Sequence, residues 1–386
     1  MQKITQFFND KLGTSMCLFI FLFINTLFCV KYFARYTDFY VIATLFVDFI
    51  LVFFFYNNFR VFNKKSLAII NYLLLVIYVI FCVIIFQVVD VDSLQVDRWS
   101  IITSFWENFE KGKYVYYAKS NVGNYPGPMP FYYILAYPFY ALKELGYFSM
   151  LCIPLFFLLL SYIKSAVEIK SKVLLLLLLS PFLWWEIMCR SNILLNSVLV
   201  LFSLVYFFNS FPNFSIKKMI VSGILFGLFL SIRNVFAIAY IIACVYALKS
   251  RYVSFYQMLI LGCISLLTFA CTFVPFIYGH WKDFLVVNPF IIQGSALIPF
   301  AYTLIFILLA FVFGLRCKSP KDVYFYITLD LFLCILTYLI YHIVNIGFES
   351  SFINSIVDIS YFLFCIPFAL FFVVKNPIHV QQTSQE

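Results

Sequence analysis

Acidic residues are scarce in this chain and gather in one stretch, residues 90–146. The chain contains 17 Asp and Glu among its 386 residues, and the segment DVDSLQVDRWSIITSFWENFE at the start of this stretch holds five of them. A carboxylate that lies among aromatic side chains at a membrane surface has a raised pKa and can act as a general base. Asp90, Asp92 and Asp97 are therefore the first candidates for catalytic residues.

Polar side chains also separate the later apolar runs. Glu186 and Arg190 lie in WWEIMCRSN, Arg233 lies in LSIRNVF, and Lys282 lies in YGHWKDFLVVNPF. Asp358 lies at the start of the last apolar run. We expect these connections to share one face of a membrane with the acidic stretch, so that their charges can meet there.

The frame that must position these residues is almost entirely apolar. The chain is 64% hydrophobic, 22% aromatic and only 11% charged, whereas charged residues make up about a quarter of an average soluble protein. This composition excludes a soluble domain and predicts an all-α, polytopic integral membrane protein. A membrane-spanning helix needs about 20 apolar residues. Hydropathy predicts twelve spans, near residues 14–33, 39–58, 67–89, 147–163, 172–185, 193–209, 218–232, 234–248, 255–278, 296–315, 323–345 and 355–374.

The basic residues indicate how the spans are oriented. Lys and Arg occur singly or in pairs at the ends of apolar runs, as expected from the positive-inside rule. If the amino terminus is cytoplasmic, most of the 26 basic residues fall on the inner side and residues 90–146 form an external loop. The excess of basic residues therefore indicates membrane anchoring and no nucleic-acid partner. We expect one transmembrane domain, residues 1–386, in the plasma (inner) membrane.

The external loop has its own expected structure. Residues 100–109 place Ile101, Phe105 and Phe109 on one side and an acid on the other, which predicts an amphipathic interfacial helix. The segment NYPGPMP, residues 124–130, cannot be helical because each proline lacks an N–H and restricts the residue before it. Residues 130–145 are too short to span comfortably and carry Pro138. We therefore expect them to lie in the interface or to dip into the membrane and return.

The order of motifs in the loop carries a family resemblance. The motifs are Asp97-Arg98-Trp99-Ser100, then Gly112-Lys113-Tyr114-Val115-Tyr116, then Gly123-Asn124-Tyr125-Pro126-Gly127-Pro128-Met129-Pro130-Phe131-Tyr132. With them the chain resembles the membrane-embedded GT-C glycosyltransferases, in particular bacterial mannosyltransferase-like members that use sugars carried on polyprenyl phosphate. Glu186, Arg190-Ser191-Asn192 and Ser231-Ile232-Arg233 also fit. The likeness covers roughly residues 90–140, and the key acid of the family can be assigned either to Asp97 or to the Asp90/Asp92 pair.

The resemblance implies a GT-C-like fold and an inverting hexosyltransferase active on the outer, periplasmic face. It would transfer a hexose, with mannose as the first candidate, from a polyprenyl-phosphate donor to a hydroxyl of an envelope glycan or lipid. Asp97 would be the general base. Arg233 and Arg190, with Lys282 behind them, would stabilise the charge on the departing phosphate.

Further loop and connection residues would contact the substrates. These are Arg98, Trp99, Tyr116, Asn124, Tyr125, Tyr132 and Glu186. No His or Cys spacing is typical of a metal site, so no cofactor is expected. Some relatives use a divalent cation bridged by acids, and Asp90, Asp92 and Asp97 leave that option open.

Other interpretations remain open for the protein and its acids. A transporter or flippase of lipid-linked sugars commonly has twelve spans, but we find no correspondence between two halves of the chain. A protein of polysaccharide assembly or polymerisation would also have a large external loop. Asp97 could simply fix the loop by pairing with Arg98 or Lys113. Asp48 and Asp330 lie inside apolar runs, where bonding between helices explains an isolated acid as well as function does.

Overall fold

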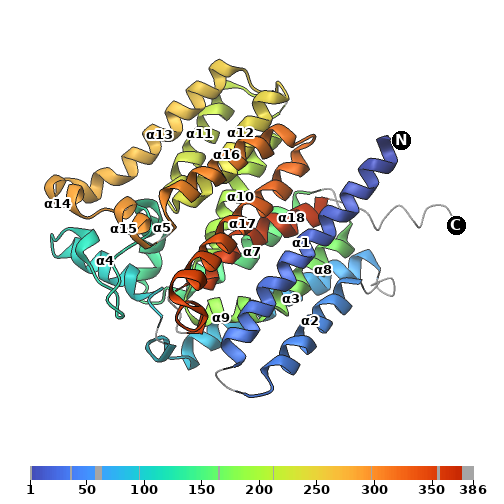
Figure 1. The fold of residues 1–386 in the computed structure, drawn as a ribbon, viewed down its shortest axis with the longest axis horizontal. Helices are drawn as coiled ribbons and strands as arrows, with labels where there is room; N and C mark the ends of the chain where they lie inside the picture. Colours follow the sequence, from blue (N-terminus) through green and yellow to red (C-terminus); the bar gives the residue numbers. More distant parts are fainter. Residues whose placement is uncertain are drawn as a thin grey trace.

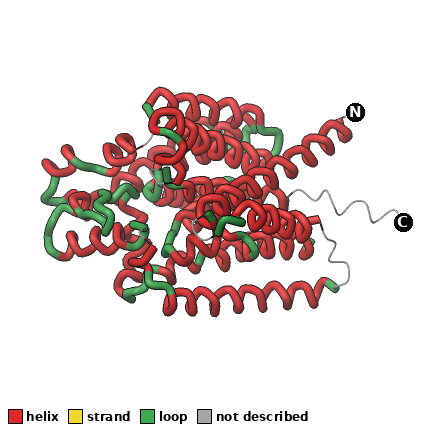
Figure 2. Tube along the Cα trace, turned by 60° about the horizontal axis from the view of Figure 1, so that its bottom comes forward, coloured by secondary structure: helices red, strands yellow, loops and turns green. Residues whose placement is uncertain are grey.

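The computed structural model describes residues 2–34, 37–56, 63–94, 96–163, 166–211, 213–296, 298–353 and 357–375. For residues 2–10 and 294–296 it describes the backbone alone. Every regular element in these ranges is a helix, as Figures 1 and 2 show, so the predicted all-α class is confirmed. 

The first half of the described chain forms ten α-helices and two short 3-10 turns, η1 and η2. They are α1 (Gln2–Phe33), α2 (Tyr40–Tyr56), α3 (Lys64–Val88), η1 (Val91–Leu94), α4 (Ser100–Glu110), η2 (Val115–Tyr117), α5 (Pro130–Ala141), α6 (Gly146–Met150), α7 (Cys152–Ser161), α8 (Val167–Leu178), α9 (Pro181–Met188) and α10 (Ile193–Asn209). The second half comprises α11 (Ile216–Leu230), η3 (Asn234–Phe236), α12 (Ala237–Lys249), α13 (Phe255–Ile277), α14 (Trp281–Val286), α15 (Pro289–Ala296), α16 (Phe300–Arg316), α17 (Pro320–Ile346), η4 (Glu349–Ile353), η5 (Ile359–Cys365) and α18 (Ile366–Lys375).

The described part of each of the twelve predicted spans contains a helix, but a count of twelve spans is not confirmed. Four helical segments are long and apolar enough to cross a membrane: residues 11–33 of α1, and all of α3, α13 and α17. The count becomes six if two bent pairs are each one span: α5 with residues 146–161, bent by 114°, and α8 with α9, bent by 56°. Pro181 begins α9, and because it has no N–H to donate it cannot continue α8.

The core is built around the carboxyl-terminal segment. All nine residues of α18 from Ile366 to Val374 are buried, which is typical of a helix enclosed by others on every side. A Cβ on Gly13 of α1 would lie 2.9 Å from the Phe372 ring of α18. At the other end of α1, Lys31 Nζ donates to the Val357 carbonyl at 3.3 Å. The two segments therefore run antiparallel, and the start of α1 and the end of α18 share one end of the bundle, here called the terminal end.

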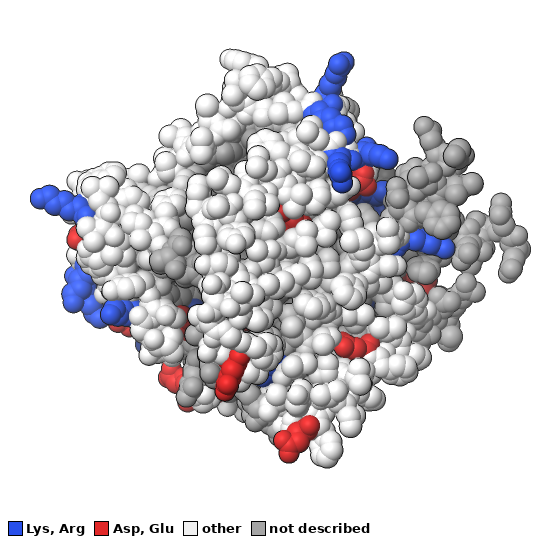
Figure 3. All heavy atoms as spheres, viewed as in Figure 1, with Lys and Arg blue, Asp and Glu red and all other residues white. Residues whose placement is uncertain are grey.

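The opposite end carries the long loop and the short helices α4, α5, α14 and α15, and is here called the loop end (Figure 1). Figure 3 shows that charges concentrate toward the two ends of the visible face, with a broad band of few charges between them. Lys249 lies at the terminal end, where its Nζ donates to the Cys317 carbonyl at 3.0 Å and so ties α12 to the α16–α17 connection. This distribution fits helices that could span a membrane.

Candidate functional site

A helix and a non-helical turn are both present in the loop. Helix α4 spans Ser100–Glu110 with Ile101 and Phe105 buried and Glu107 and Glu110 exposed, as predicted, but Phe109, expected on the buried side, is 41% exposed. A location of this helix in the membrane interface stays a prediction. The segment at 124–129 has no helix. Helix α5 then begins at Pro130, whose fixed φ suits the first helical position. Its bend of 114° from the helices that follow agrees with a segment that does not continue into a straight span.

Aromatic packing joins α4 to α5. The rings of Phe105 and Tyr133 stack with their centroids 3.6 Å apart, and both side chains are fully buried. Trp106 Nε1 donates to the Tyr133 carbonyl at 3.2 Å. Tyr116, predicted to bind substrate, is also fully buried and donates to the Pro128 carbonyl at 3.4 Å. Tyr116 therefore stabilises the turn through a buried hydrogen bond.

Asp97 accepts a hydrogen bond from the turn. Asn124 Nδ2 donates to Asp97 Oδ2 at 2.7 Å, so two residues predicted to be in the site are in direct contact. The Asp97 side chain is partly buried, and in the described part of the chain its pairing is with Asn124, with Arg98 engaged elsewhere. One carboxylate oxygen is thus held in place while the other stays available as a proton acceptor.

Arg98 connects the loop to the carboxyl-terminal segment. Its Nη2 donates to Asp358 Oδ2 just before η5, across 260 residues of sequence. Burial alone would raise the pKa of Asp358, but the charge of Arg98 and the Ser360 N–H bond outweigh it and lower that pKa. For Arg98, burial lowers the pKa, yet the attraction of Asp358, Glu186 and Asp97 raises it well above its usual value. Both groups are therefore charged at neutral pH.

Glu186 of α9 lies in the same group of residues as the Arg98–Asp358 pair, and this group is here called the polar cluster. Its side chain is only 2% exposed, and Ser360 Oγ donates to its Oε1 at 2.5 Å. Its contact with Ser360 places it close to Asp358, the partner of Arg98. Glu186, predicted to bind substrate, is thus part of the network that holds Arg98.

Arg233 and Tyr132 complete the cluster. The Arg233 guanidinium lies 5.6 Å from the centre of the Tyr361 ring, within range of a cation–π interaction. Asn192 Nδ2 donates to the Tyr132 hydroxyl at 3.4 Å. The Tyr132 side chain is buried, and a Cβ on Gly127 would lie 3.8 Å from Arg233 Nη1, so Arg233 is a neighbour of the turn whose Asn124 holds Asp97.

The turn is held over Arg233 by backbone contacts. Met129 N–H donates to the Ile232 carbonyl at 3.2 Å, and Phe131 N–H donates to Ser231 Oγ at 3.3 Å. Gln293 of α15 donates to the Gly127 carbonyl from the other side. The end of α11 therefore sets the position of the turn.

Several buried polar atoms in this region neither donate nor accept a hydrogen bond among the described residues. They are Trp99 Nε1, Asn192 Oδ1, both amide atoms of Asn196, and Arg233 Nε. A buried polar atom without a partner costs free energy, so these atoms are candidates for bonding to water or a ligand.

Arg190 does not resemble a free phosphate ligand. It is 4% exposed, and its guanidinium donates to the carbonyls of Met188, Phe86 and Val89 at 2.7, 3.0 and 3.1 Å. Its Nε also bonds Glu144 Oε1 at 3.3 Å. These contacts cap the end of α3, so the geometry fits a structural role.

The remaining predicted residues lie at the edge. Lys282 is exposed on α14, and Tyr125 is 43% exposed beneath Lys119 Nζ, 5.2 Å from its ring centre. Asp90 is exposed and accepts from the Asp92 N–H at 3.0 Å, which makes this pair a local turn at η1. Of the two acidic motifs, Asp97 is therefore the one in contact with the cluster.

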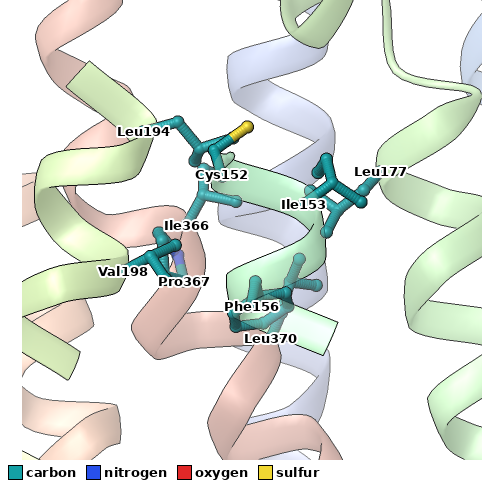
Figure 4. Close-up of a pocket in the computed structure, with 9 residues that line it drawn as sticks. All are labelled: Cys152, Ile153, Phe156, Leu177, Leu194, Val198, Ile366, Pro367 and Leu370. Atoms are coloured by element: carbon teal, nitrogen blue, oxygen red, sulfur yellow. The ribbon is translucent and has the colours of Figure 1, made fainter. Parts of the chain in front are cut away.

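Two hollows mark the surface and core, and neither is lined by Asp97, Arg98 or Arg233. One, with a volume of about 10 Å³, lies where α7, α8, α10 and α18 meet and is too small and apolar for a substrate. Figure 4 shows the residues that line it. A groove of about 540 Å³ lies against α4, α5 and α13. An outward cavity beside Asp97 thus stays a prediction. The described residues contain no group of three or more His, Cys, Asp or Glu able to hold a metal ion.

Sequence reasoning did not select several members of the cluster. Asp358 was noted only as a polar break, Asn192 only as part of a motif that fits the resemblance, and Ser360 and Tyr361 were not singled out. The signal that could have found Asp358 is an acid directly before an apolar run, at the same membrane face as Arg98. The chain matches no protein-family model, no curated protein and no solved structure.

Proposed function

We propose that this protein is a membrane glycosyltransferase that transfers a hexose from a polyprenyl-phosphate donor to a hydroxyl acceptor at the loop end. The observation that carries this proposal is that one turn contacts both kinds of group: Asn124 donates to Asp97, and a Cβ on Gly127 would lie 3.8 Å from Arg233 Nη1. A base and fixed cations are what such a transfer requires, because a hydroxyl must lose its proton while a phosphate departs.

The roles follow from the contacts. Asp97, oriented by Asn124, accepts the proton of the acceptor hydroxyl, while the oxygen of that hydroxyl forms a bond to the anomeric carbon of the sugar. The bond from that carbon to the phosphate oxygen breaks, and the leaving lipid phosphate takes the electron pair. Arg233, with an unpartnered buried Nε, is positioned to bind the phosphate, whereas Arg98 is already paired with Asp358.

The proposal places the loop end outside the plasma membrane. The terminal end, where α12 meets the α16–α17 connection through Lys249, is the basic side expected in the cytoplasm. The start of α1 and the end of α18 share that end, which agrees with an even number of crossings.

The test is transfer in detergent from a radiolabelled polyprenyl-phosphate hexose, in separate arms for mannose and glucose, to extracted envelope lipids and glycans. Asp97→Asn should lower the rate about 10²- to 10⁴-fold, the range for losing a general base. The matched control is Asp90→Asn, because Asp90 is an exposed acid of the same loop whose contacts are local. Full activity in Asp97→Asn, or an equal loss in Asp90→Asn, would contradict the assignment of Asp97.

A further inference from the structure

The groove of about 540 Å³ is a separate feature of the loop end. Its lining includes Trp106, Phe109 and Glu110 of α4, Ile134 and Tyr137 of α5, and Phe276 of α13. This volume is within the usual range for small-molecule sites. The stacked Phe105 and Tyr133 rings, fully buried behind Trp106, separate it from the polar cluster.

The lining is aromatic and rigid. The Trp106 ring lies 4.5 Å from the Tyr137 ring centre and 5.8 Å from that of Phe276, and Phe109 lies 5.5 Å from Phe276. Trp106 is also fixed by its hydrogen bond to the Tyr133 carbonyl. The groove is therefore an apolar surface that three helices hold open.

Helix α13 also presents exposed apolar side chains next to the groove-lining Pro275 and further along the helix. Val274 is 54% exposed, and Leu267 and Leu266, two turns earlier, are 67% and 64% exposed. Helix α13 is one of the four candidate spans, so these side chains would face lipid. A hydrocarbon chain could then enter the groove sideways from the bilayer.

The groove has one charged lining residue, and it is acidic. Tyr140 Oη donates to Glu110 Oε2 at 3.2 Å, whereas Oε1 accepts no hydrogen bond within the described part of the chain. Glu107, nearby on α4, is exposed and bonds Lys111 at 3.1 Å. A carboxylate repels a lipid phosphate but accepts a hydrogen bond from a hydroxyl.

We infer that this groove binds one hydrocarbon chain of a neutral, hydroxyl-bearing lipid of the diacylglycerol class, with the hydroxyl at Glu110. The inference goes beyond the proposed function and does not depend on it. The groove is thus a lipid-binding site distinct from the polar cluster, and its acid discriminates against anionic lipids.

Trp106 gives a direct readout. The full chain is placed in phosphatidylcholine nanodiscs with a low mole fraction of dibrominated diacylglycerol or dibrominated phosphatidylglycerol, because bromine quenches nearby indole fluorescence. The signal of Trp106, one of five Trp residues, is the difference between wild type and Trp106→Phe. We expect about fivefold stronger quenching by the diacylglycerol, the factor that corresponds to two like charges about 4 Å apart in a water-like dielectric.

Two variants decide the outcome. Glu110→Gln should remove the preference for the diacylglycerol over the phosphatidylglycerol. Ile134→Phe, which fills the groove, should remove the quenching of Trp106 fluorescence. Ile224→Phe, an exposed apolar site on α11, should change neither. Equal quenching by both lipids in wild type would indicate bilayer contact only and overturn the inference, as would quenching that survives in Ile134→Phe. If Ile134→Phe does not fold, the comparison of Glu110→Gln with wild type still decides.

Discussion

Replacing Asp358 by Asn tests whether the ion pair with Arg98 fastens the polar loop to the bundle. The Asp358 and Arg98 side chains are 29% and 16% exposed, so the pair is partly shielded from water. Asn keeps the shape of Asp and can still accept the Ser360 N–H bond, which is 3.0 Å long. The substitution therefore removes the charge and little else.

The expected loss in the free energy of unfolding lies between two limits. Breaking a fully buried pair by removing one partner costs about 3–5 kcal/mol, and a surface pair is worth about 0–1 kcal/mol. Arg98 also keeps the attraction of Glu186 and Asp97. We expect Asp358→Asn to lower the free energy of unfolding by about 2 kcal/mol.

The pH dependence has a definite sign. The pKa of Asp358 is lowered in the folded protein, so its contribution to stability is present above the unfolded pKa of about 3.9 and is lost as the pH falls through the folded pKa. Wild type should lose this part of its stability below about pH 4. Asp358→Asn should lack that component.

The measurement is a double-mutant cycle with Arg98→Met, using denaturant unfolding of the purified protein in detergent at pH 7 and at low pH. We expect a coupling free energy of about 1–2 kcal/mol at pH 7, the size seen for residues in contact. Asp90→Asn serves as the control, because that exposed acid has only local contacts. A coupling below about 0.5 kcal/mol would refute the claim that this pair fastens the loop.

Two further substitutions separate structure from chemistry. Arg190→Met should lower the free energy of unfolding by about 3 kcal/mol, because it leaves the Phe86 and Val89 carbonyls without their donor, and thermal unfolding in detergent should show it. A fully stable Arg190→Met protein with lowered donor binding would instead restore the phosphate role. Asn124→Ala should leave stability within about 0.5 kcal/mol because Asn124 is exposed, yet lower the transfer rate at saturating donor. An unchanged rate would mean that Asn124 does not orient Asp97.

The sequence alone was sufficient to predict the features that depend on a local residue pattern. Apolar periodicity predicted α4, and prolines predicted the turn at residues 124–129, although Pro130, expected in the same turn, is the first residue of α5. Composition predicted the all-helical class. These features are set by a few neighbouring residues, so they can be read without knowing the tertiary contacts.

The pairings in the site could not be read in this way. Arg98 could equally have paired with Asp97, its neighbour, and the choice of Asp358 depends on how η5 packs 260 residues later. Arg190 was expected to bind the phosphate because it fits the motifs of the family resemblance, but its guanidinium bonds the carbonyls at the end of α3. The number of spans was equally hard to predict, since hydropathy does not show a bend such as the 56° between α8 and α9.

The antiparallel packing of α1 against η5 and α18 also constrains biosynthesis. Helix α1 leaves the ribosome long before α18, yet Phe21, Ile24 and Phe28 are buried in a core that includes α18. The Lys31 bond to Val357 likewise spans 326 residues. Such distant contacts form late, so a chain cut short before Asp358 would leave α1 incompletely covered and Arg98 without its partner. Truncated products should thus be recognised by membrane quality control, because the same final segment completes both the core and the polar cluster.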